Sequence, residues 1–407
     1  MECATWLGYG LETFMTEFIA KSALRQSFSD ALSTMYRKEV PAYGTLLDIV
    51  ADVNAKIDPA QAVDAARLGQ ERHGAIRVGT ARDLSILRRA FQQLGMEPVG
   101  YYDLSVAGLP IHSTAFRPIT EDELTVSPFR MFTSLLRPEL IDDVTLRKEA
   151  MSALSERDIF SPELLPLLEE AEKTGGIKQA KADAFIQAFL PTFKWHDKAQ
   201  VSLDTYERLK AHHPLIADIV SFKGPHINHL TPRTLDIDVA QNEMRTRGLK
   251  AKEVIEGPPK RKCPILLRQT AFKALSETIA FKQGGNWVDN THTARFGEIE
   301  QRGAALTPKG RELYDICLAK KDFSAFPDDW DTLRNEKLAF FRKTETGFEP
   351  LTYEDFLPVS AAGIFRSNLG EDGEAQALKA ESNQAAFEEA LGASVHDMFE
   401  LYAQNAN

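Results

Sequence analysis

Two histidines at matching places in the chain are the residues that point most directly to chemistry. His73 and His229 each open the pattern His-x-x-x-Arg, and the two copies are 156 positions apart. The string Thr-Ala-Phe recurs at the same offset, at residues 114–116 and 270–272. Two strings that keep one spacing indicate a duplicated supersecondary unit. Because imidazole is a common metal ligand, the histidine pair is a candidate metal site.

The arginine of each pattern adds a second function to the predicted site. Alternate residues of a strand share one face, so His73 projects together with Arg77, and His229 together with Arg233. An imidazole binds a metal ion, and a guanidinium binds a carboxylate through two parallel hydrogen bonds. The spacing therefore predicts a site for a small, metal-bound acid.

A third metal ligand is expected from the extended stretch 293–303. This stretch carries Glu298 and Glu300 on one strand face. Two neutral histidines and one carboxylate leave open positions on one side of a divalent ion, as in non-haem iron(II) oxygenases, where a 2-oxo acid and dioxygen can bind. Spacing alone leaves open which glutamate is the ligand, since Glu300 can instead pair with Arg302.

The remaining histidines are weaker candidates. His226 precedes His229 by three residues but lies outside the repeat register, so we interpret it as a loop residue or a support for a ligand. His212 and His213 end a predicted helix, where a cation is favourable. The other four are expected to be structural: His112, His196, His292 and His396.

The elements that must position these residues form two matching units of strand, helix and three strands. This βαβββ unit is the building block of vicinal oxygen chelate proteins, in which two units curl into one cupped sheet around a metal. We therefore predict an α+β fold with added helical segments. The expected regions are N-terminal helices (1–60), a first βαβββ module (61–143), a helical insertion (144–222), a second module (223–310), and a C-terminal helix, lid loop and tail (311–407).

Hydrophobic periodicity gives the expected elements. In the first module they are a strand at 73–78, a helix at 83–94, and extended segments at 100–116 and 129–136. In the second they are a strand at 229, a helix at 239–247, and strands at 264–272 and 293–301. Single helices are expected at 203–222 and 308–320.

Composition excludes several classes of protein. The 407 residues exceed one ordinary core, and 43% hydrophobic with 26% charged residues is typical of a globular protein. The net charge of -11 argues against a general affinity for nucleic acid or anionic membranes, and no apolar run has the length of a membrane span. Three distant cysteines, Cys3, Cys263 and Cys317, predict reduced thiols in the cytoplasm. The oligomeric state is not predicted.

Six strings together resemble one enzyme family. They are Glu-Val-Pro-Ala-Tyr-Gly-Thr-Leu-Leu (39–47), Arg-His-Gly-Ala-Ile-Arg (72–77), Ile-Asn-His-Leu-Thr-Pro-Arg (227–233), Arg-Phe-Gly-Glu-Ile-Glu-Gln-Arg-Gly (295–303), Ala-Leu-Thr-Pro-Lys-Gly-Arg (305–311) and Leu-Pro-Val-Ser-Ala-Ala-Gly-Ile-Phe (357–365). In combination they resemble the 2-oxoadipate dioxygenase/decarboxylase family. The segment from Phe296 also resembles, more distantly, the iron-binding strand of hydroxyphenylpyruvate dioxygenases, whose ligand is the first glutamate of Glu-x-x-Gln-Arg. That likeness selects Glu298 over Glu300.

The resemblance implies a set of roles for the residues already singled out. His73, His229 and Glu298 would bind iron(II) and meet the substrate there. Family members convert 2-oxoadipate and dioxygen to 2-hydroxyglutarate and carbon dioxide, a step of lysine breakdown. The expected partners are therefore a small dicarboxylic 2-oxo acid and dioxygen.

Two further roles are implied away from the metal. Arg77 would hold a substrate carboxylate and so serve catalysis, and a loop containing Val359 and Ser360 would close over the substrate. Two alternatives remain open. One is an oxygen-independent isomerase or lyase of the glyoxalase type acting on a small 2-oxo acid, and the other is a non-catalytic protein that binds small acids.

Overall fold

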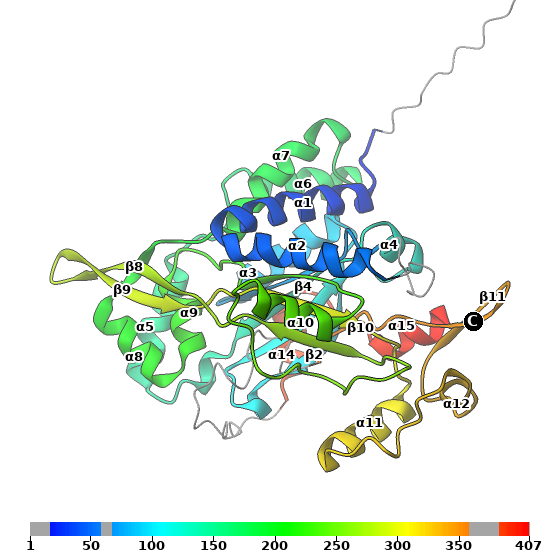
Figure 1. The fold of residues 1–407 in the computed structure, drawn as a ribbon. Helices are drawn as coiled ribbons and strands as arrows, with labels where there is room; N and C mark the ends of the chain where they lie inside the picture. The colour runs from blue at the N-terminus through cyan, green and yellow to red at the C-terminus, as the bar shows by residue number, and fades with distance from the viewer. Residues whose placement is uncertain (1–16, 58–66, 358–381, 407) are drawn as a thin grey trace, which may run out of the picture.

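The protein has an α+β fold in which helices surround a strongly curved central sheet (Figure 1). The computed structural model describes residues 17–57, 67–357 and 382–406. Within these ranges no helix has both the length and the apolar character needed to cross a membrane.

The first unit has the predicted order of strand, helix and three strands. Its elements are β1 (Arg72–Val78), α3 (Ala81–Gln93), β2 (Glu97–Asp103), β3 (Ile111–Arg117) and β4 (Phe129–Leu136). The helix begins where the Thr80 side chain accepts a hydrogen bond from the Asp83 amide, an N-cap that satisfies one free donor. Strand β1 pairs in parallel with β4, and the strand order is β2-β3-β4-β1.

The second unit repeats this arrangement and joins the first edge to edge. Its elements are β6 (His229–Pro232), α10 (Ile237–Thr246), β7 (Leu267–Ala271) and β10 (Glu298–Arg302). Strand β7 pairs antiparallel with β10, and a parallel bridge between Arg233 and Glu300 links β6 to β10. Residues 251 and 256 bridge to β7, in the place that β2 takes beside β3. Strands β1 and β6 pair antiparallel and connect the two units.

The sheet separates two apolar cores, which sets the direction of every side chain on it. Ile76 and Val78 of β1 and Ile299 of β10 belong to the core packed under the N-terminal helices. Ala75, which precedes Ile76 on the strand, belongs to the core on the other face. Alternation along β1 and β10 therefore turns the predicted site residues to the inside of the cup.

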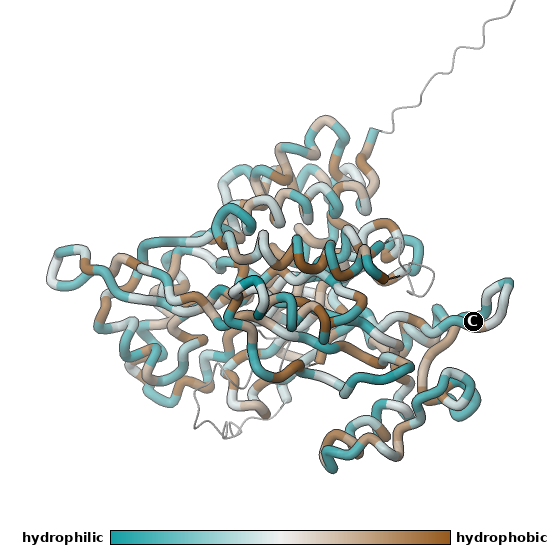
Figure 2. Tube along the Cα trace, viewed as in Figure 1, coloured by the Kyte–Doolittle hydropathy of each residue, from teal (hydrophilic) through white to brown (hydrophobic). Residues whose placement is uncertain are grey.

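A hairpin interrupts the second unit, and here the expected strand 293–301 is wrong. The segment divides into β9 (Asn286–Thr293) and β10, with a break between them. Strand β9 pairs with β8 (Ser276–Gln283), and β8 pairs in parallel with β5 (Lys198–Ser202). The hairpin projects from the body (Figure 1), and polar residues predominate toward its tip (Figure 2).

Helices of the N-terminal region and of the segment 144–222 cover the sheet. They are α1 (Lys21–Glu39), α2 (Pro41–Ala55), α5 (Val144–Ser155), α6 (Leu164–Thr174), α7 (Ala182–Phe189), α8 (Leu203–His212) and α9 (Pro214–Ser221). The single helix expected at 203–222 is wrong, because His213 is extended and Pro214 starts a new helix. A residue before proline is disfavoured in the helical region.

The C-terminal region begins with the helix that was predicted at 308–320. This helix is α11 (Pro308–Lys320), and Thr307 caps it. The later elements are α12 (Trp330–Asn335), β11 (Phe341–Thr344), β12 (Gly347–Pro350), α14 (Gln384–Leu391) and α15 (Met398–Asn405). The short helices elsewhere are α4 (Glu121–Val126), η3 (Ser105–Ala107), η4 (Pro138–Leu140), η5 (Gln179–Lys181) and η6 (Leu190–Phe193).

Candidate metal centre

Three predicted ligands from three strands meet inside the cup. His73 lies on β1, His229 on β6 and Glu298 on β10, and one ligand atom of each lies within 4.8 Å of the others. All three residues are fully buried. The imidazole centroids are 5.4 Å apart, and His73 Nε2 lies 3.2 Å from Glu298 Oε1. The register that pairs Ala75 with His229 brings the two histidines together across the junction of the units.

Several polar atoms of this cluster lack a partner. Both ring nitrogens of His229 and Oε2 of Glu298 are buried and make no hydrogen bond with the described residues. Leaving a buried polar group unsatisfied costs about 1–3 kcal/mol, so such groups call for an explanation. Two imidazoles and a carboxylate are the donor set that divalent transition metals prefer. The residues therefore fit a bound metal ion.

The charge states of His229 and Glu298 also suit a metal ion. Burial lowers the pKa of His229 to about 4, so its imidazole is neutral and can donate a lone pair at neutral pH. Burial opposes ionisation of Glu298, but His229 and His73 outweigh it and keep the pKa of this carboxyl below its usual value. A neutral imidazole and an ionised carboxylate are the forms that bind metals.

Glu300, the rival of Glu298, has a different position. Its Oε2 lies 2.8 Å from Nδ1 of His73, the nitrogen that points away from Glu298. Arg302 holds the same carboxylate through two hydrogen bonds of 2.9 Å. A carboxylate on the far nitrogen of a metal-binding imidazole orients the ring and makes it a better ligand. The structure thus brings Glu298 to the cluster and Glu300 to the back of His73.

The Glu298 carboxylate is oriented by neighbours on the same face of the sheet. Its Oε1 accepts hydrogen bonds from Gln269 Nε2 (2.7 Å) and Thr231 Oγ1 (3.1 Å). Farther out, the Tyr36 hydroxyl of α1 lies 2.7 Å from the carbonyl oxygen of Phe296 and 3.1 Å from that of Asn228. These contacts fix the chain just before Glu298 and just before His229.

The arginines of the repeated pattern have unequal partners. Arg77 Nη1 donates to Asp218 Oδ2 at 2.8 Å, whereas Arg233 Nη1 donates to Glu71 Oε2 at 2.8 Å. Arg233 thus belongs to a buried group of charges, which also includes Arg67, Arg130, Arg302 and Glu354. Val359 and Ser360 lie outside the described residues.

Sequence reasoning missed several residues around the centre. Asp218, in α9, contacts both His226 and His292, and His292 was expected to be merely structural. Lys252 lies beside β7, where its amide donates to the Ala271 carbonyl oxygen. Burial lowers the pKa of Lys252 to about 7, against the opposing effects of Glu256 and Glu298. The spacing of these residues in the sequence does not indicate a shared site, because only long-range contacts bring them together.

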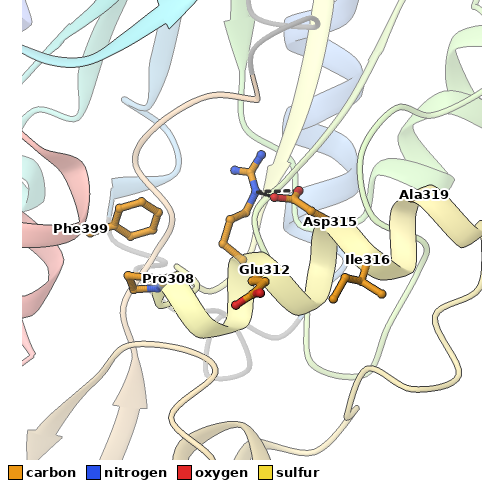
Figure 3. A pocket seen from close by; sticks show the side chains of 7 residues that line it. Pro308, Glu312, Asp315, Ile316, Ala319 and Phe399 are labelled. Atoms are coloured by element: carbon orange, nitrogen blue, oxygen red, sulfur yellow. Dashed lines mark hydrogen bonds and ion pairs between the residues drawn. The ribbon is translucent and has the colours of Figure 1, made fainter.

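Phe356 lies against the imidazole of His73, with ring centroids 5.0 Å apart. It also contacts the ring of Phe132 at 5.3 Å, so apolar rings cover this side of the cluster. A hollow elsewhere, along α11, is lined by residues that include Arg311, Asp315 and Phe399 and contains none of the three ligands (Figure 3). The candidate centre is therefore the buried cluster and not this hollow.

Comparisons with known proteins agree with the predicted family. A family model described as 2-oxoadipate dioxygenase/decarboxylase matches residues 28–368. A protein of that description from Pseudomonas putida is 50% identical over 96% of this chain and 96% of its own length. One from Mycobacterium tuberculosis is 41% identical over 93% of this chain and 95% of its own.

Solved structures give the same result. The hydroxyglutarate synthase from Pseudomonas putida in complex with 2-oxoadipate matches with a TM-score of 0.86 and 48% identity, over 96% of this chain and 97% of that one. A putative glyoxalase superfamily protein from Ralstonia eutropha matches with a TM-score of 0.52 at 20% identity, over 73% and 88% of the two chains, which confirms the vicinal oxygen chelate type of fold. By sequence and by structure, this chain belongs to the 2-oxoadipate dioxygenase/decarboxylase family.

Proposed function

We propose that the protein is an iron(II)-dependent dioxygenase and decarboxylase that converts 2-oxoadipate and dioxygen to 2-hydroxyglutarate and carbon dioxide. The atoms of these two substrates equal those of the two products, so the reaction needs no external reductant or second 2-oxo acid. The observation that carries the proposal is the buried cluster of His73, His229 and Glu298 with its unpartnered ligand atoms. Relatives over nearly the whole chain are described by the same activity.

These three residues would hold iron(II), which would supply a Lewis acid for the 2-oxo acid and electrons for dioxygen. The surrounding residues hold the metal ligands in suitable charge states and directions. His229 is neutral at physiological pH, and Glu300 turns Nε2 of His73 toward Glu298. Gln269 and Thr231 donate hydrogen bonds to Oε1 of Glu298, and Oε2 accepts none from the described residues. The surrounding apolar rings limit the access of water.

Arg77 sets the length of the acid that reacts. It lies on the same face of β1 as His73, four residues farther along the strand. A metal that binds the 2-oxo acid end and a guanidinium that binds the distal carboxylate together measure the distance between the two ends. Val359 and Ser360, which lie outside the described residues, are proposed substrate-binding residues from the family resemblance alone. Free, buried thiols at Cys263 and Cys317 support a cytoplasmic enzyme, and the reaction serves lysine breakdown.

An oxygen electrode tests this function directly. The iron(II)-loaded protein is given 2-oxo dicarboxylic acids of four to seven carbons, and oxygen uptake and carbon dioxide release are measured together. We expect one mole of each per mole of 2-oxoadipate and slower turnover of shorter and longer acids. Turnover that continues without oxygen would instead establish the isomerase or lyase alternative.

Arg77→Met tests the carboxylate clamp. Methionine keeps the apolar stem but removes the charge, so we expect kcat/KM for 2-oxoadipate to fall on the order of a hundredfold, the effect of losing a charged hydrogen bond of about 2–3 kcal/mol. The monocarboxylate 2-oxohexanoate has no distal charge and serves as the matched substrate. Equal losses on both acids would exclude the clamp.

A further inference from the structure

A second buried cluster lies behind Arg77, outside the repeated units. Asp218 of α9 places Oδ1 2.9 Å from Nε2 of His292, on β9, and 3.1 Å from Nε2 of His226. Its other oxygen, Oδ2, accepts from Arg77 Nη1 at 2.8 Å. Asp218 is nearly fully buried, and both of its oxygens have partners. The carboxylate therefore lies between two imidazoles and the guanidinium of the proposed clamp.

The histidine side of this cluster is itself held in place. Tyr206 of α8 brings its hydroxyl to 3.0 Å from Nδ1 of His292. A carboxylate can only accept hydrogen bonds, so Nε2 of His292 donates to Asp218. On the other side, the ring of His226 packs edge to face on Trp195, with centroids 4.6 Å apart. Asp218 is thus fixed by contacts that reach into two helices and a strand.

Electrostatics keep Asp218 charged. Burial opposes its ionisation, but the two histidines and Arg77 outweigh burial and hold the pKa of this carboxyl well below its usual range. A buried arginine needs such a counter-ion, because an unpaired charge inside a protein costs several kcal/mol. One guanidinium has five N–H donors, and Oδ2 of Asp218 accepts a hydrogen bond from one of its nitrogens. The contact fixes the direction of the Arg77 guanidinium.

The same three residues could also hold a metal ion, but the contacts favour an anchor. Two histidines and one carboxylate occur here as in the first cluster. In the first cluster Oε2 of Glu298 has no partner, whereas here the second carboxylate oxygen is paired with a fixed cation. His292 also makes a well-formed hydrogen bond to Asp218. Nε2 of His292 and both oxygens of Asp218 are therefore already engaged in this contact and in the pair with Arg77.

We propose that Asp218, supported by His226 and His292, is a positioning residue that holds the Arg77 guanidinium in the direction from which it receives the distal carboxylate of the 2-oxo acid. The inference rests on the proposed function, in which Arg77 binds that carboxylate. It assigns a purpose to two segments outside the repeats. The helices α8 and α9 and the hairpin β8–β9 supply the anchor, and the equivalent arginine, Arg233, is held by Glu71 instead.

The test uses Asp218→Asn in the iron-loaded enzyme. Asparagine keeps the shape and an acceptor for a histidine but removes the charge that pairs with Arg77. We expect kcat/KM for 2-oxoadipate to fall on the order of tenfold, mainly through a higher KM, as coupled residues in contact commonly show. The value for 2-oxohexanoate should change less than about threefold. Iron content should stay at one per chain.

A double mutant separates positioning from a general loss of structure. If Asp218 acts through Arg77, then Arg77→Met with Asp218→Asn should be no worse than Arg77→Met alone. Tyr206→Phe, which removes only the hydroxyl behind His292, should give a smaller loss in the same direction. Tyr206→Phe also serves as the test of the positioning role if Asp218→Asn folds poorly. The matched control is Asp238→Asn, which breaks a 2.7 Å pair with Arg268 in the second unit and should leave substrate selectivity unchanged.

The outcomes distinguish the two proposals. Equal losses on both acids with additive effects in the double mutant would overturn the positioning role, and so would loss of one of two bound metal equivalents in Asp218→Asn. A selective loss in Arg77→Met without one in either Asp218→Asn or Tyr206→Phe would overturn it while leaving the clamp intact. If Arg77→Met itself shows no selectivity change, the clamp in the proposed function is wrong.

Discussion

Glu298 and Glu300 show how two like residues on one strand face acquire different roles. Both are fully buried, and their side chains point to the same side of β10. Arg302 donates to both oxygens of Glu300, whereas Oε2 of Glu298 accepts no hydrogen bond from the part of the chain that the structure describes. From the sequence, both glutamates are candidate ligands, and Glu300 can instead pair with Arg302. Only the fold shows that this pair leaves Glu300 behind His73.

Metal content separates the two glutamates. His73→Ala, His229→Ala and Glu298→Ala should each lose bound iron and oxygen uptake, because each removes a ligand. Glu300→Gln should keep the ligand set and weaken metal affinity by about 10–100-fold, the usual effect of a residue that orients a ligand. Iron can be measured after anaerobic dialysis, with circular dichroism as the control for folding. Full iron in Glu298→Ala together with loss in Glu300→Ala would reverse the assignment.

The secondary elements were predictable where a local pattern repeats or a chain signal is strong. Strand β3 begins at Ile111 and β7 at Leu267, an offset equal to that of the two histidines. Helix α11 has the expected bounds because a capping threonine precedes a proline. Pro214 also carried a readable signal, which was missed. The gap between β9 and β10 has no local signal, since it depends on the pairing of β8 with the distant β5.

Strand β10 depends on a close approach of the main chain just after it. A Cβ added at Gly303 would lie 2.2 Å from the carbonyl carbon of Pro264 and 2.4 Å from the amide of Ile265. Backbone atoms cannot move aside as a flexible side chain can. Gly303→Ala should therefore destabilise the protein by about 1–3 kcal/mol and shift β10, which carries Glu298.

Urea denaturation and iron content together measure this effect. Gly303→Ala should lower both the unfolding midpoint and the bound iron. Gly176→Ala is the control, because the nearest atom to its added Cβ is 3.5 Å away on Phe18, an ordinary contact. That variant should lie within about 0.5 kcal/mol of the parent. Equal stability of the two variants would argue against a strict need for glycine at 303.

Across the whole molecule, buried and half-buried histidines make stability depend on pH. Burial lowers the pKa of His112, His196 and His213 to about 4, as it does for His229. In the unfolded chain a histidine has a pKa near 6.5, so the unfolded state binds these protons first. The stabilising contribution is therefore complete above about pH 6.5 and is lost as the pH falls through about 4.

His112 is the best single residue for testing this dependence. Its ring packs against Phe387 of α14, with centroids 4.7 Å apart, and takes no part in the metal centre. His112→Phe keeps an aromatic ring and removes the titration. Between pH 7 and pH 5, His112 should lower the free energy of unfolding of the parent by about 2 kcal/mol. Urea midpoints at pH 7, 6 and 5 should fall less steeply in the variant, and parallel profiles would contradict the assignment.

The two ligating histidines belong to different copies of the repeated unit, on the strands that pair with each other at the junction. Each copy supplies one imidazole. The carboxylate comes from the second copy alone, because the residue of the first copy that matches Glu298 is Phe132. A chain with a single unit would need a second molecule, docked along the same edge, to complete the pair. Two units in one chain remove this requirement, and the two copies then differ at this place: the second carries the acid, and the first carries a ring that lines the cup.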